Sequence, residues 1–227
     1  LDGLAKLALV GDDPADAAQL LDACATLARE VGDDWTLATV SNALGDVARS
    51  QGDYPRAKSA YDESLTLFGI LHNDGQRPSL LHNLGYVALH ERDYARSREL
   101  FCESLGLFQR FGERRGVAEC LVGFASIAAA AGRPDHAARL FGAAEAAFET
   151  LGTQLSASNR ADYARHLAIA RASMRPAAFA AAWTAGQQFP LQQAVDQALQ
   201  VTESGDSQSG SSAGKRVDRP SGRRTPI

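Results

Sequence analysis

Apolar residues recur along most of this chain at the three- and four-residue spacing of one helix face. Leu37, Val40, Leu44 and Val47 form one such set, and this spacing predicts an amphipathic helix. Helices are predicted on this basis at 15–31, 36–51, 55–71, 77–91, 95–111, 116–131, 135–151, 159–173, 176–185 and 191–201. Short segments with Gly, Asp or Pro separate them, as expected where one helix ends and the next begins. The fold class is therefore predicted to be all-α.

The same pattern returns every 40 residues without a gap. The positions that match from one unit to the next are Leu44, Leu84 and Phe124; Gly45, Gly85 and Ala125; Ala57, Ser97 and Ala137; Tyr61, Phe101 and Phe141; Ser64, Ser104 and Ala144. The register extends back to Ala17 and Leu21, so four units are expected within residues 1–156, the first helix of the first unit beginning before Leu1. One helix pair cannot bury its apolar face alone, so such units are stable only when stacked.

The Leu-Gly pair, followed by a small, an aromatic and a second small residue, resembles the tetratricopeptide repeat (TPR) family. The resemblance implies a right-handed α-α superhelix of helix hairpins, with partners bound in a concave groove lined by the first helices. The third unit departs from the family pattern, because Phe124 and Ala125 replace Leu-Gly. The period of 40 residues also exceeds the usual period of about 34, so longer helices and turns are expected.

Residues 138–199 carry a second resemblance. The stretches are Ala138-Arg139-Leu140-Phe141-Gly142, Arg160-Ala161-Asp162-Tyr163 and Phe179-Ala180-Ala181-Ala182-Trp183. They resemble the C-terminal sensor region of bacterial STAND-type signalling ATPases, which include LuxR-family, MalT-like transcriptional regulators. In such proteins an NTPase domain precedes the repeats and a helix-turn-helix sometimes follows them. Neither is found in this sequence, which begins at Leu1 and is expected to be a piece of a longer protein.

The TPR resemblance also indicates where a partner would bind. Carried over residue by residue, the groove positions are Thr39, Asn42, Asp46 and Arg49; Ser79, His82, Tyr86 and His90; Glu119, Val122 and Ser126. Hydrogen-bonding groups around a central aromatic residue suit a protein or peptide partner, or a small inducer. A solvated solenoid face would have the same composition, so both interpretations stay open.

The end of the chain differs from the repeats. Residues 157–202 are predicted to cap the open end of the array, with Phe179 and Trp183 on one face packing onto the last repeat. Residues 203–227 are Ser, Gly, Asp, Gln and Arg with almost nothing apolar, so this tail is predicted to be disordered.

Composition and charge change this picture little. The net charge of −4 gives no electrostatic reason to expect nucleic acid or a membrane as a partner of the folded part. The basic residues of the tail are Lys215, Arg216, Arg219, Arg223 and Arg224, which suit a solvated end, or contact with nucleic acid or an acidic partner. Neither a run of about 18 apolar residues nor a signal peptide is found, so a cytoplasmic location is expected. The oligomeric state does not follow from the sequence.

Motifs for nucleotide or metal chemistry are incomplete. The stretch from Gly210 to Lys215 is one residue too short for a phosphate loop and lacks the following hydroxyl. His82 and His90 share a helix face with Tyr86, but no further ligand joins them at helical spacing, so a polar groove wall is favoured over a metal site.

The three cysteines indicate packing rather than chemistry. Cys24 occupies the small-residue position of its unit, and Cys102 and Cys120 have no histidine at a helical neighbour position. An odd number without paired spacing also argues against a disulfide framework. We therefore expect a non-catalytic module without a cofactor or metal, most simply the sensor part of a bacterial regulator. The alternative is a free-standing TPR adaptor, and a helical hydrolase or transferase lacks any supporting motif.

Overall fold

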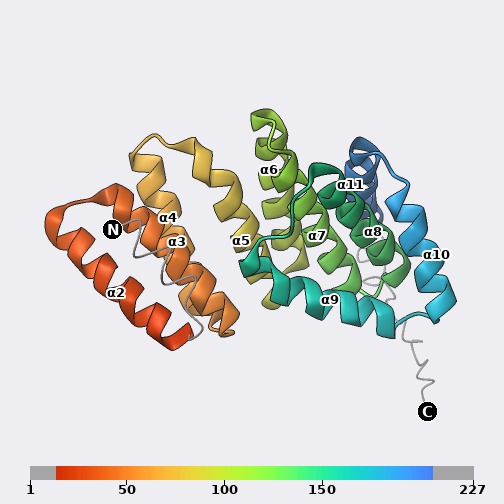
Figure 1. Ribbon diagram of the computed structural model, residues 1–227, viewed down its shortest axis with the longest axis horizontal. Helices are drawn as coiled ribbons and strands as arrows, with labels where there is room; N and C mark the ends of the chain where they lie inside the picture. Colours follow the sequence, from red (N-terminus) through yellow and green to blue (C-terminus); the bar gives the residue numbers. More distant parts are fainter. Residues whose placement is uncertain (1–13, 207–227) are drawn as a thin grey trace, which may run out of the picture.

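The computed structural model describes residues 14–206, and side chains from 17 to 200. The described part of the chain consists of helices α2 (Pro14–Val31), α3 (Asp34–Ser50), α4 (Tyr54–Ile70), η1 (Asp74–Gln76), α5 (Arg77–His90), α6 (Tyr94–Phe111), α7 (Arg114–Ala130), α8 (Pro134–Leu151), η2 (Ala157–Asn159), α9 (Arg160–Ala172), α10 (Pro176–Gln187) and α11 (Leu191–Asp206). Successive hairpins stack in chain order (Figure 1). The predicted all-α, TPR-like solenoid is confirmed.

Every predicted helix within this range is present, and the bounds differ by a few residues. The clearest difference is α11, which reaches Asp206 instead of ending at 201. No proline follows to stop it, and extending a formed helix needs only one more residue per hydrogen bond. The predicted first helix of the first unit and the basic residues of the tail lie outside the described residues. The division into array, cap and tail stays a prediction.

The helix ends follow local side-chain chemistry. Asp33, Asp53 and Asp93 are N-caps, and each carboxylate accepts a hydrogen bond from the backbone N–H three residues later, which satisfies an otherwise unpaired donor of the first turn. Gly112 and Gly152 end α6 and α8 with φ of 72° and 62°. Glycine adopts this left-handed conformation without a steric penalty, so the repeated glycines set the turns between units.

The aromatic residues of two repeats, Tyr61 and Phe101, rest on glycine. A Cβ added to Gly85 would lie 2.9 Å from the Phe101 ring, and one added to Gly123 would lie 2.6 Å from it. Phe101 therefore packs against α5 of its own unit and α7 of the next. Tyr61 likewise covers Gly45 of its own unit. The small residues thus admit a ring that joins neighbouring helices, which is how one unit buries the apolar face of another.

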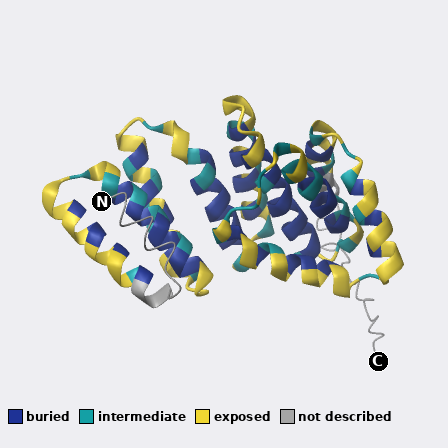
Figure 2. Ribbon diagram, viewed as in Figure 1, coloured by how far each residue is buried: buried dark blue, intermediate teal, exposed yellow. Residues whose placement is uncertain are grey.

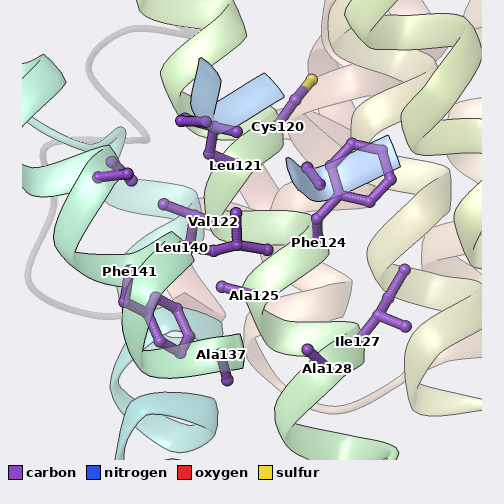
Figure 3. Packing of buried hydrophobic residues seen from close by; sticks show 14 of the residues in the cluster. Cys120, Leu121, Val122, Phe124, Ala125, Ile127, Ala128, Ala137, Leu140 and Phe141 are labelled. Carbon is purple, nitrogen blue, oxygen red and sulfur yellow. The ribbon is translucent and has the colours of Figure 1, made fainter. Parts of the chain in front are cut away.

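The apolar core runs along the stack. Its largest cluster joins α5 to α11, and two smaller clusters hold α2 to α3 and α3 to α6. Figure 3 shows part of the large cluster, with Val122 of α7 beside Leu140 of α8. The first helices α5 and α7 are buried along almost their whole length (Figure 2), which is more than stacking in one row would produce.

The helices after α8 explain this extra burial. As predicted, α10 packs along α8, the last repeat helix, and both α10 and α11 contribute to the large apolar cluster. The chain between α8 and α9 instead turns back along the array, so that η2 contacts α3 and α9 contacts α7 and α8 (Figure 1). η2 and α9 therefore lie over the side of the first helices, whereas α10 lies over α8.

Candidate functional site

The inner face, defined here as the surface of α3, α5 and α7 that carries the predicted groove residues, is covered by the chain itself. Five of these residues are buried, namely Arg49, His82, Tyr86, Val122 and Ser126. The other six are partly buried, namely Thr39, Asn42, Asp46, Ser79, His90 and Glu119. The stacked units do bring residues of all three helices together, and Arg49, His90 and Glu119 among them contact η2 and α9. Whether they bind a partner stays a prediction.

Arg49 is the centre of these contacts. Its side chain is only 1% exposed and donates to Asp162 Oδ2 at 2.5 Å, to the Ser158 carbonyl oxygen at 2.9 Å and to Asn159 Oδ1 at 2.9 Å. It also donates to the Tyr61 hydroxyl at 3.2 Å. A guanidinium presents several donors in a fixed plane. One cation of α3 therefore binds both η2 and the first turn of α9.

His90 of α5 holds the second oxygen of the same carboxylate. Its Nε2 donates to Asp162 Oδ1 at 2.6 Å, and Arg165 Nη1 donates to its Nδ1 at 3.1 Å. Because the arginine can only donate, Nδ1 must accept, which assigns the proton of a neutral ring to Nε2. Tyr54 stacks on the His90 ring at 4.2 Å and accepts a hydrogen bond from Arg165.

The pKa values of two carboxyl groups at this site, Asp162 and Asp46, are shifted in opposite directions. Burial alone would raise the pKa of Asp162, but the hydrogen bond from His90 and the charge of Arg49 outweigh it and lower that pKa. Burial dominates at Asp46 and raises its pKa, although Arg49 and the Tyr61 hydroxyl act against it. The inner face thus stabilises the ionised form of Asp162, which α9 supplies, more than the ionised form of its own Asp46.

Glu119 of α7 binds the segment before α9. Its Oε1 accepts from the Ser156 backbone N–H at 3.2 Å, and its Oε2 accepts from Asn159 Nδ2 at 3.3 Å. Arg115 pairs with the same carboxylate from the exposed side, at 3.2 Å. Consecutive units therefore supply a cation, an imidazole and an anion to one short segment.

His82 and Tyr86 lie beneath this layer and belong to the core. The His82 ring contacts the rings of Tyr86 and Phe101 at 5.1 and 5.2 Å, and its Nε2 bonds the Glu119 carbonyl oxygen. Burial lowers the pKa of His82. The Tyr86 hydroxyl is buried without a hydrogen-bond partner in the described part of the chain.

The sequence reasoning missed the residues that α9 contributes, above all Asp162 and His166. His166 donates from Nδ1 to the Asp162 carbonyl oxygen at 2.8 Å, and burial lowers its pKa. Asp162, His166 and Ala170 are four residues apart and buried, so they share one face of α9. An aspartate and a histidine on a buried face were the available signal, because buried charged groups need partners.

The cysteines and the remaining polar groups offer little further chemistry. Cys24 and Cys120 are buried, and burial raises the pKa of the Cys120 thiol to about 12, which makes it unreactive. Among residues 14–206, no three His, Cys, Asp or Glu side chains come together in a way that could hold a metal ion. None of the helices in that range is long and apolar enough to cross a bilayer.

Comparison with known families identifies the repeats. Residues 76–150, which contain α5 to α8, match a family model described as tetratricopeptide repeat. These two hairpins are therefore similar to tetratricopeptide repeats. The α3–α4 hairpin places Tyr61 on Gly45 as its TPR neighbour places Phe101 on Gly85. No curated protein matches the chain.

The TPR assignment bears on function at a general level. TPR arrays are a protein-interaction fold that generally lacks enzymatic activity, and the family match indicates no catalytic family. The TPR hairpins of this chain also carry Glu119 and His90, which contact η2 and α9. The site therefore consists of a TPR surface and a segment of the same chain bound to it.

Proposed function

We propose that this chain is a non-catalytic binding module whose inner face takes a protein or peptide partner, or a small inducer. The observation that carries the proposal is the convergence of Arg49, His90 and Glu119 on one segment of about a helical turn and a half. Three consecutive units contribute one polar group each. Binding surfaces of repeat proteins are built in this way, from equivalent positions of successive units.

We propose further that the module is the sensor part of a bacterial signalling ATPase or transcriptional regulator, acting in the cytoplasm. The resemblance of residues 138–199 to such sensor regions supports this, as does the shared apolar cluster that links α7 and α8 to α10 and α11. A change at the inner face would reach α10 through α9. The alternative is a free-standing TPR adaptor. An in-frame Walker motif upstream of the Leu1 codon would favour the sensor, and a nearby start codon would favour the adaptor.

The binding role is testable by affinity capture with the full chain as bait. Glu119→Gln and Arg49→Met remove groups that face η2 and α9, whereas Leu27→Ser changes a residue of α2 that is 46% exposed and distant from them along the array. Tyr86 is unsuitable for substitution in this test, because it is completely buried and truncating its side chain would leave a destabilising cavity. We expect a specific partner to be lost by at least tenfold with the inner-face variants and retained with Leu27→Ser. Equal retention by all three would show that the partner binds elsewhere.

A further inference from the structure

We infer that residues 156–162, here called the strap, are an exchangeable internal ligand of the inner face, and that the partner is an acidic helical segment that takes the strap's place. The partner would present a carboxylate one helical turn after an amide, as Asp162 follows Asn159. This inference rests on the proposed function and gives its partner a chemistry.

The strap contacts the inner face through polar groups. Arg49 binds Ser158, Asn159 and Asp162. Glu119 binds Ser156 and Asn159, and His90 binds Asp162. Each of these hydrogen bonds has a counterpart in water, so separation exchanges one polar partner for another.

The rest of α9 is attached differently. Leu167 and Ala170 belong to the large apolar cluster, and Tyr163 packs edge-on against Phe141 of α8 at 5.4 Å. Apolar contacts have no counterpart in water, so this half of the helix stays on the array when the strap leaves. The strap is therefore tethered close to its site, and local opening of such a polar segment precedes global unfolding.

The groups facing the strap select the partner's charge. Arg49 and His90 together present donors to both oxygens of one carboxylate, an arrangement that matches the planar geometry of that group. Glu119 presents an acceptor to an amide and a backbone N–H. A basic segment would set a cation against Arg49, and a polyphosphate would meet Glu119 and Asp46. An acidic helix that also carries an amide satisfies both ends.

The experiment uses the full chain and a labelled peptide of residues 154–168 as the probe. Fluorescence anisotropy would compare the wild type with the double variant Asn159→Ala/Asp162→Ala, in which the internal competitor is weakened. We expect the peptide to bind the double variant at least tenfold more tightly than the wild type. Asp162→Ala within the peptide should weaken that binding at least tenfold, and so should Arg49→Met added to the double variant.

Equal affinity for the wild type and the double variant, or no binding to a double variant of native helical content, would overturn the inference. If the double variant loses its helical circular dichroism, hydrogen exchange of the wild type decides. Amides of 159–164 that exchange well before those of α7 and α8 support an exchangeable strap, whereas simultaneous exchange overturns it. Loss of captured partner with Glu119→Gln but failure of the peptide would leave the binding role intact and remove only the exchange. Peptide binding without any effect of Glu119→Gln on capture would support the exchange of the strap and remove the proposed role of the inner face in binding the captured partner.

Discussion

The two attachments of the C-terminal helices to the array differ in their chemistry. A Cβ on Gly186 of α10 would meet the backbone of Arg139, and one on Gly142 of α8 would meet the backbone of Trp183. These two helices therefore touch along their backbones with no room for a side chain. The strap meets the inner face through Arg49 and its hydrogen-bonding partners instead.

This difference in chemistry indicates which of the two attachments is the more permanent. Close packing of apolar groups and backbones resists separation, because water offers no equivalent contact. Hydrogen bonds and ion pairs compete with water and contribute little net free energy, although they strongly favour one partner chemistry over another. We therefore expect α10 to stabilise the array, whereas the strap, in our proposal, indicates the chemistry of the partner that the inner face binds.

The largest expected effect is at the α8–α10 contact. Gly186→Ala would force the two backbones apart and should reduce the free energy of unfolding by about 3 kcal/mol, as overpacking does in tight cores. Urea unfolding followed by circular dichroism measures this. Gly106→Ala is the matched control, because the added Cβ in α6 meets nothing within 4 Å, so it should stabilise the helix by about 0.5–1 kcal/mol. A loss at Gly186 no larger than at Gly106 would mean that α10 does not seal the array.

The stacked hairpins were predictable and the covered inner face was not. The 40-residue register fixed Tyr61 and Phe101 as packing residues, because periodic apolar positions constrain which helix faces meet. The burial of Arg49 depends on Asp162, which lies 113 positions later in the sequence. Helical periodicity predicts which residues share a helix face, but it does not predict which distant segment of the chain packs against that face. The signal in the sequence for this contact was the pair Asp162 and His166, which lie four residues apart on one helix face.

Arg49→Met should produce the second largest effect. Removing one partner of a buried ion pair costs about 3–5 kcal/mol when the other charge stays trapped. Asp162 can regain water if the strap leaves, so the loss of global stability should level off nearer to about 2 kcal/mol. Hydrogen exchange should show amides of 159–164 losing protection while those of α10 keep it. Equal loss of protection in both regions would contradict the separation between strap and α10.

Acidification should loosen the strap before it affects α10. The pKa of His166 is lowered by burial, so the docked state favours the neutral ring. Stability from this group is complete above the unfolded value of about 6.5 and is lost as pH falls below it. The lowered pKa of Asp162 adds a further loss below about pH 4.

Exchange protection of the strap, compared at pH 7.5 and pH 5 after correction for intrinsic rates, measures the change. We expect the protection of the strap to be weaker at pH 5 than at pH 7.5, because docking favours the neutral ring of His166. Asp46, whose pKa is raised by burial, works against the trend, whereas His82, whose pKa is lowered by burial, works with it. His166→Gln should therefore reduce the pH dependence of strap protection without abolishing it. Stronger protection at pH 5 would show that His166 is charged when docked.

The smallest effect is expected at the rim of the strap. Arg165 is exposed and reaches the Tyr54 hydroxyl at 3.2 Å and His90 Nδ1 at 3.1 Å. Exposed polar contacts of this kind contribute about 0.5 kcal/mol or less, because water and salt screen them. Arg165→Gln should therefore change local opening of the strap far less than Arg49→Met, and the difference should persist at high salt. If the two variants were equivalent, the strap would be held by its exposed rim, and the buried guanidinium could not be what selects an acidic partner.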